Sequence, residues 1–126
     1  MTLRVKLTKD EVNSGRIIPN GEYVGIVHSI TEDETQGGDW MVVADLKVEG
    51  HPEYAGVVVR DWLGKWFRGA DKLRRFIEAL TNSPYDYEKE YDLTKATGTK
   101  VRFFNQQGTD NQGRPCNSIV DYQQMK

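Results

Sequence analysis

The sequence is poor in the residues on which disulfide, thiolate-metal and histidine chemistry depend. Its 126 residues include one cysteine, Cys116, and two histidines, His28 and His51. A lone cysteine excludes an internal disulfide and any site built on several thiolates. The histidines belong to no catalytic motif, and the chain carries no phosphate-binding loop, metal-ligand spacing or nucleophile elbow. We therefore expect no enzymatic activity, no metal and no cofactor.

Long apolar runs are also missing. None approaches the roughly 20 residues that a membrane-spanning helix needs. The first six residues lack the apolar core and cleavage site of a signal peptide. We therefore expect no membrane association and a cytoplasmic location, and the length suits a single domain over residues 1–126.

Positive charge is not in excess, because 17 lysines and arginines face 19 acidic residues, for a formal net charge of −2. The charges are unevenly distributed along the chain. When basic and acidic regions are separate, an acidic protein can still present a cationic groove. Segments 32–39 and 86–92 are acidic, and the sequence assigns them no role. The alternative to a cationic groove is that the charges are solvated and scattered over the surface. Segment 60–75 holds six basic residues against Asp61 and Asp71, so its local charge is 6 − 2 = +4: Arg60, Lys65, Arg68, Lys72, Arg74 and Arg75.

Apolar residues that alternate with polar ones predict five strands, because a period of two is typical of a half-buried strand. The predicted strands are 22–30, 40–49, 57–63, 99–105 and 115–122. Spacings of three and four over residues 70–80 predict an amphipathic helix. Residues 1–16 are expected to form a short strand or an arm, and Gly25 suggests a bulge or a tight bend in the first long strand.

The order of three strands, one helix and two strands predicts a mainly β protein. It is the order of a five-stranded OB-fold barrel with one α-helix between strands 3 and 4. An SH3-like barrel and an open α+β sheet are the competing predictions.

Aromatic and basic residues alternate closely in segment 60–68, which is the combination that single-stranded nucleic acid requires: rings for the bases and cations for the phosphates. If Val57, Val59 and Leu63 face the core, Arg60 and Trp62 share the outer face. The candidate nucleic-acid-binding residues are Tyr23, Arg60, Trp62, Lys65, Trp66, Phe67, Arg68, Lys100, Arg102, Phe104, Arg114 and Tyr122.

Several of these positions have a second interpretation. Trp62, Trp66, Phe67 and Phe104 could instead pack structurally. In the fourth strand, Val101 and Phe103 are expected to point inward while Lys100, Arg102 and Phe104 point outward. Trp40 shares the phase of Val42 and Leu46, which favours the core, and His28 shares the phase of Val24 and Ile26, which favours a core or edge position.

With these residues the chain resembles a family of small bacteriophage proteins that are encoded among replication and recombination genes. The family is regarded as OB-fold single-stranded DNA-binding proteins. The resemblance covers most of the chain and rests on four segments: Pro19–Tyr23, Trp40–Val48, Lys72–Leu80 and Asn117–Tyr122.

The resemblance implies that the protein coats single-stranded DNA in the host cytoplasm during phage replication or recombination, without a cofactor and with little sequence preference. Phage or host replication and recombination proteins are then its expected partners. Many such proteins end in an acidic tail that recruits partners, whereas this chain ends Asp121-Tyr122-Gln123-Gln124-Met125-Lys126. Recruitment through a C-terminal tail is therefore not expected.

Two other functions are compatible with the same residues. The first is an OB-like protein–protein interaction module of a phage replication or structural assembly, because tryptophan, tyrosine and arginine also dominate protein interfaces. The second is carbohydrate binding, which is less favoured because it has no use for the neighbouring cations. The sequence leaves open whether the strand is DNA or RNA and whether the chain forms a homo-oligomer.

Overall fold

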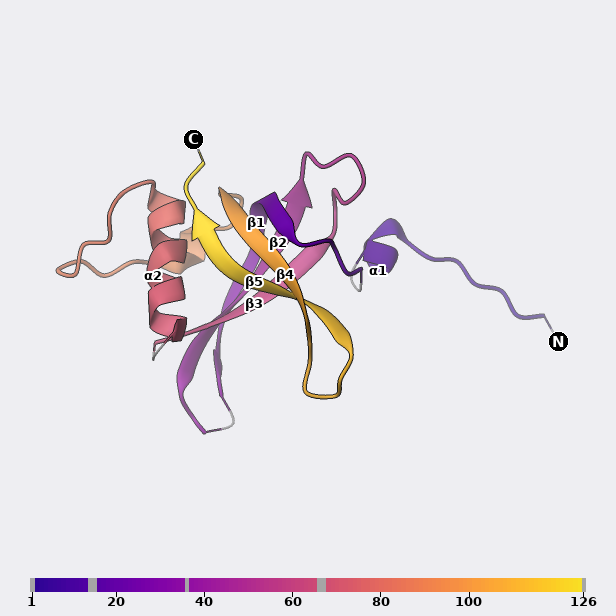
Figure 1. The fold of residues 1–126 in the computed structure, drawn as a ribbon, viewed down its shortest axis with the longest axis horizontal. Coiled ribbons are helices and arrows are strands. Elements are labelled where there is room, and N and C mark those ends of the chain that lie inside the picture. Colours follow the sequence, from indigo (N-terminus) through magenta and orange to yellow (C-terminus); the bar gives the residue numbers. More distant parts are fainter. Residues whose placement is uncertain (1, 14–15, 36, 66–67, 126) are drawn as a thin grey trace.

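A computed structural model describes residues 2–13, 16–35, 37–65 and 68–125 and shows a mainly β protein (Figure 1). The long helix α2 follows β3 and precedes β4, as the sequence predicted. In chain order the elements are α1 (Lys9–Asn13), β1 (Gly21–Glu34), β2 (Trp40–Glu49), β3 (Val58–Gly64), α2 (Arg68–Thr81), the short 3₁₀ helix η1 (Leu93–Lys95), β4 (Lys100–Thr109) and β5 (Pro115–Gln123).

The five strands form one antiparallel sheet in the order β3-β2-β1-β4-β5. β1 is central, and it pairs with β4 over Gly21–Ile26 and with β2 from Val24 to Glu34. β1 and β4 are longer than predicted, so the expected loops 31–39 and 106–113 shrink to short turns. The turns of the β1–β2 and β4–β5 hairpins lie on the same side of the molecule (Figure 1).

The core lies between the inner face of the sheet and α2. The inward phases predicted for β2, β3 and β4 are confirmed, since these residues are at most 2% exposed: Val42, Ala44, Leu46, Val48, Val57, Val59, Leu63, Val101 and Phe103. Phe76 and Ala79 of α2 cover them. Trp40 packs against the core while remaining half-buried.

From Tyr23 to Val27 the inward phase of β1 is the opposite of the predicted one, whereas Ile30, beyond the register shift, packs against the core. Tyr23 and Val27 are buried, with exposures of 7% and 0%, while His28 is exposed. The Tyr23 hydroxyl donates to the Pro19 carbonyl oxygen at 2.7 Å. The expectation that Tyr23 offers an outward ring is therefore wrong. The physical reason is Gly25, whose missing side chain leaves room on the inner face for the ring of Phe103.

The irregularity in β1 lies at His28 and not at Gly25. The register with β2 shifts between Val27 and Ser29. There the Val27 backbone N–H donates to the Thr99 carbonyl at 2.9 Å, and the Val27 carbonyl accepts from Gly98 at 2.8 Å. The bulge thus lets β1 bind the segment that leads into β4.

The N-terminal residues form an arm rather than a strand. Residues 2–8 have no regular structure and are exposed, and they lead into α1. The arm extends away from the sheet, on the side opposite α2 (Figure 1). Its base is fixed to β5, because the Asn117 side chain donates to the Arg16 carbonyl and accepts from the Ile18 N–H, both at 2.9 Å. Of the helices in the described residues, none has the length and apolar character to cross a membrane.

The sheet is not closed into a hydrogen-bonded barrel. β3 and β5 are its two edges, and within the described ranges no backbone ladder joins them. Side chains join these edges instead: the Tyr122 hydroxyl on β5 donates to the Asp61 carboxylate on β3 at 2.6 Å. The predicted mainly β fold with five strands and one helix after the third is therefore observed, but its sheet is not closed into a barrel by hydrogen bonds.

Replacing Gly25 by alanine tests the close packing under β1. A Cβ at Gly25 would lie 2.9 Å from Phe103 Cε1 and 3.3 Å from Leu46 Cβ. Because Phe103 is fully buried and cannot swing away, Gly25→Ala should lower the free energy of unfolding by about 1–3 kcal/mol, measured by urea denaturation. Gly108→Ala is the matched strand control, since nothing lies within 4 Å of its Cβ. Equal effects of the two substitutions would contradict the packing.

Candidate nucleic-acid interface

A buried carboxylate orients the strand that carries the candidate site. Asp61 is 5% exposed, in phase with Val59 and Leu63 on the inner face of β3. Its Oδ1 accepts from the Lys72 ammonium at 2.8 Å and its Oδ2 from the Tyr122 hydroxyl. Lys72 also donates to the Ile119 carbonyl at 3.0 Å. β3, α2 and β5 therefore meet at one carboxylate.

The same burial shifts two ionisation equilibria. Desolvation raises the pKa of Asp61 above the ordinary aspartate value, although Lys72 and Tyr122 act in the opposite direction. Desolvation and the adjacent Asp61 carboxylate also raise the pKa of Tyr122 well above the ordinary tyrosine value. Tyr122 is 3% exposed and belongs to the core. The expectation that it offers a ring on the outer face is therefore wrong.

Because Asp61 points inward, its neighbours Arg60 and Trp62 point outward, as predicted. The Trp62 side chain is 54% exposed, which is unusual for an indole in a strand. Arg60 makes a two-point ion pair with Asp45 of β2, Nε to Oδ1 at 2.8 Å and Nη2 to Oδ2 at 3.2 Å. The hydrogen bond from Arg60 lowers the pKa of Asp45, so this carboxylate is ionised at neutral pH.

The strand register extends this surface across β2 and β1. Trp62 lies opposite Val43, which in turn lies opposite Thr31. Val43 is 8% exposed although it belongs to the outer face. Asp45 accepts a further hydrogen bond from Ser29 Oγ at 3.1 Å. The outer face therefore carries an exposed indole, an apolar position next to it and one ordered ion pair.

The predicted residues of β4 lie on the same face but farther away. Three strand spacings separate β3 from β4, about 14 Å across the sheet. Lys100 pairs with Glu49 at 3.1 Å, and Arg102 pairs with Glu22 at 3.4 Å. Phe104 is half-buried. These cations are thus accompanied by carboxylates, and the face is less positive than segment 60–75 suggested.

Trp62 also borders a groove that the sequence did not predict. The groove has a volume of about 530 Å³ and lies where β3, α2 and β5 meet. Arg75 in its wall pairs with Asp121 at 2.7 Å and with Asp71 at 3.1 Å. The helical spacing of Lys72 and Arg75 within the basic segment was the available signal. The lining residues are Trp62, Gly69, Asp71, Lys72, Arg75, Ser118, Ile119 and Val120.

The remaining candidates are dispersed. Lys65 lies away from Trp62, with its ammonium 4.4 Å from the centroid of the Trp40 ring. Arg114, in the turn between β4 and β5, pairs with Asp110 at 3.1 Å. Trp66, Phe67 and the side chain of Arg68 lie outside the described residues. The structure therefore brings Arg60 and Trp62 together and leaves Lys65 and Arg114 apart from them.

Comparison of the sequence with protein families and curated proteins identified no relative. A scan of protein-family models gave no match, and no curated protein matched the sequence. In the described part of the chain, no group of three histidine, cysteine, aspartate or glutamate side chains is placed to hold a metal ion.

Removing the Tyr122 hydroxyl tests the link between the sheet edges. Tyr122→Phe leaves the ring in place but deprives a buried carboxylate of a donor, so it should lower the free energy of unfolding by about 1.5–3 kcal/mol. Tyr23→Phe is the control, because that hydroxyl donates to a neutral carbonyl, and it should cost about 0.5–1.5 kcal/mol. Urea denaturation measures both. A smaller loss of unfolding free energy in Tyr122→Phe than in Tyr23→Phe would contradict the claim that the hydrogen bond to Asp61 holds the sheet edges together.

Proposed function

We propose that the protein binds single-stranded DNA on the outer face of its sheet, with Trp62 as the main stacking surface and without catalysis. The observation that carries the proposal is the exposed indole of Trp62 beside the Arg60 guanidinium on one strand. Stacking of a base on such a ring is worth about 1–3 kcal/mol and tolerates any base. The adjacent Arg60 guanidinium would contact one of the two phosphates that flank the stacked base.

The strand order supports the assignment of an OB fold. A five-stranded OB fold is a partly open barrel that binds oligonucleotides on its second and third strands and on the loops between strands 1 and 2 and between strands 4 and 5. In this chain those loops are residues 35–39 and 110–114, and they lie on the same side of the sheet (Figure 1). In such a barrel, the hydrogen bond between Tyr122 and Asp61 would join the two edge strands through their side chains.

The bound strand would run across β3, β2 and β1 toward β4. Trp62 would hold one base, and the groove beside it would place Lys72 and Arg75 near a phosphate. Phosphates would compete with the carboxylates that now accept from Arg60 and Arg75. Each phosphate that replaces such a carboxylate releases condensed counterions, so affinity should fall as salt rises, with a slope set by the number of phosphates neutralised.

The biological setting of the proposal comes from the resemblance to phage single-stranded DNA-binding proteins. In that setting the protein would coat DNA during phage replication or recombination in the host cytoplasm. Phage or host replication proteins would be its partners.

A second candidate function is a protein–protein interaction module on the same face. Three cations of the outer face each have a carboxylate partner: Arg60 with Asp45, Lys100 with Glu49 and Arg102 with Glu22. Such ordered pairs around apolar positions also suit a protein interface. Ionic strength separates the two functions, because binding through phosphates weakens steeply with salt and an apolar interface does not.

The first experiment is a titration with a labelled dT oligonucleotide of about 30 nucleotides, long enough for a complete OB-fold site. Duplex DNA of equal length is the control, and both are measured at low and high salt with tryptophan fluorescence followed. Salt-sensitive, single-strand-selective binding with quenched fluorescence supports the proposal. Absence of binding at low salt refutes it and favours the protein partner.

Trp62→Ala should weaken binding of the dT oligonucleotide by about 1–3 kcal/mol, because it removes the stacking ring. The substitution should leave the free energy of unfolding within about 1 kcal/mol of the wild type, since more than half of the side chain is already in water. Tyr87→Ala is the matched control, because Tyr87 is 81% exposed but lies on the other side of α2. An equal loss of affinity in both variants would contradict the assignment of the face.

Substitutions at the Arg60–Asp45 pair should change DNA binding in opposite directions. Arg60→Ala removes one cation, so it should weaken binding and reduce the slope of log affinity against log salt by about 1. Asp45→Asn frees the guanidinium and removes a nearby negative charge, so it should strengthen binding at low salt. Fluorescence titration at several salt concentrations measures both effects. Weaker binding by both variants would mean that the intact pair, and not the cation, contacts the ligand.

A further inference from the structure

The N-terminal arm presents an apolar edge to solvent. Leu3, Val5 and Leu7 are 88%, 75% and 63% exposed. In an extended chain these alternate residues point to one side, and Arg4 and Lys6 point to the other. Exposing three aliphatic side chains along one side of a segment costs a monomer free energy. Such a pattern is typical of a segment that adds to another surface.

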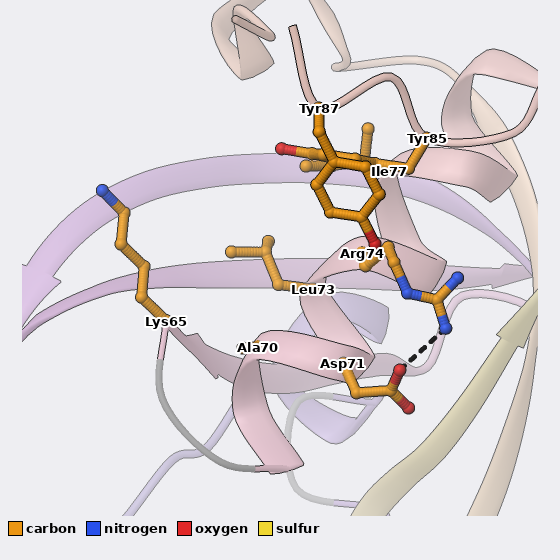
Figure 2. Close-up of a pocket in the computed structure, with 8 residues that line it drawn as sticks. All are labelled: Lys65, Ala70, Asp71, Leu73, Arg74, Ile77, Tyr85 and Tyr87. Carbon is orange, nitrogen blue, oxygen red and sulfur yellow. Dashed lines mark hydrogen bonds and ion pairs between the residues drawn. The ribbon is translucent and has the colours of Figure 1, made fainter. Parts of the chain in front are cut away.

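A groove with matching properties lies on the opposite side of the molecule, between α2 and the segment that follows it. Its first cavity has a volume of about 570 Å³. Figure 2 shows residues that line it, among them Leu73 and Ile77 of α2 and Tyr85 and Tyr87 of the following segment. A second cavity of about 480 Å³ shares Lys65, Leu73, Ile77 and Tyr85 with the first and continues toward Trp40. We call these two joined cavities the tyrosine groove.

The wall of the tyrosine groove is ordered by internal contacts. The Tyr85 ring lies 5.0 Å from Tyr87 and 4.9 Å from Tyr91 between centroids. Glu78 of α2 accepts from the Tyr85 N–H at 3.0 Å. Tyr87 nevertheless remains 81% exposed. The groove therefore exists before a ligand arrives, and it exposes aromatic surface that a ligand would cover.

The arm and segment 86–92, which forms one wall of the groove, have opposite net charges. Residues 2–9 carry Arg4, Lys6 and Lys9 and no acidic residue, so their charge is +3. Segment 86–92 carries four acidic residues and Lys89, so its charge is −3. Its members Glu90 and Asp92 line the groove with Glu32 and Asp71, against the basic Lys65, Arg74 and Lys89, so the lining as a whole carries 3 − 4 = −1. The apolar floor thus matches the apolar side of the arm, and the acidic segment 86–92 beside it matches the basic side.

We propose that the tyrosine groove binds the N-terminal arm of a second copy of this chain. The arm leaves the molecule on the side away from α2, and its base is fixed to β5 (Figure 1). Its direction therefore carries it toward a neighbouring molecule and away from its own groove. Arm and groove are different surfaces, so the contact is head-to-tail, and repetition builds a ring or a filament. This inference goes beyond DNA binding and does not depend on it.

Sedimentation velocity of the full chain without DNA, over a range of concentrations, tests the proposal. The wild type should associate as concentration rises. An arm variant, Leu3→Asp with Val5→Asp, should weaken association about tenfold or more, because it would place carboxylates on an apolar floor beside the acidic segment 86–92. A groove variant, Tyr87→Ala with Glu90→Lys, should do the same from the other side. Val12→Asp, at an exposed apolar position of α1, is the matched control and should associate like the wild type.

Mixing the two defective variants makes the test specific to a head-to-tail contact. The arm variant keeps an intact groove and the groove variant keeps an intact arm, so an equimolar mixture should form a dimer that grows no further. Circular dichroism confirms that each variant is folded. The proposal is overturned if the wild type stays monomeric at hundreds of micromolar. It is overturned equally if both variants associate like the wild type, or if the mixture of variants remains monomeric.

Discussion

The arrangement of this protein depends on one buried carboxylate at the gap between the two edges of its sheet. Asp61 loses most of its hydration, and the Lys72 ammonium and the Tyr122 hydroxyl replace it. A buried charge is tolerated only when such partners are present, since an unpaired one costs several kcal/mol. The contact therefore binds β3, β5 and α2 in a fixed relation. It also holds β3 in the phase that turns Arg60 and Trp62 outward.

The molecule carries two surfaces of different composition, on its outer sheet face and beside α2. The outer face of the sheet combines the exposed Trp62 with cations that have carboxylate partners, and the proposed DNA site lies there. The tyrosine groove on the far side of α2 combines apolar and tyrosine side chains with charges of both signs and lies beside the acidic segment 86–92, and we assign it to a protein segment. A chain with two such surfaces can hold a neighbour through one and a nucleic acid through the other.

Much of the fold could be predicted from the alternation of apolar residues, because a strand with one buried face must repeat every two residues. This worked for β2, β3 and β4. It failed for β1, where Val24 and Ile26 alternate with Tyr23 and Val27 so that both phases are apolar. The packing of Phe103 on Gly25 decides between these phases, and such a contact between distant residues leaves no periodic signal.

The candidate site could be predicted only in part for a similar reason. Arg60 and Trp62 follow from the phase of their own strand. The carboxylate partners of the cations, such as Asp45, come from neighbouring strands and require the register. The burial of Tyr122 depends on its contact with Asp61, which is 61 residues away in the chain. Long-range pairings of this kind set the charge of a surface, and no local pattern contains them.

The most direct test of the DNA-binding face is an NMR titration of the three tryptophan indole N–H signals with a dT oligonucleotide. The Trp62 signal is assigned by its disappearance in Trp62→Phe. Our account predicts that this signal shifts on addition of the oligonucleotide and returns when salt is added, while the Trp40 signal moves little. A Trp62 signal that stays unchanged at low salt, with or without a shift of Trp40, would contradict it.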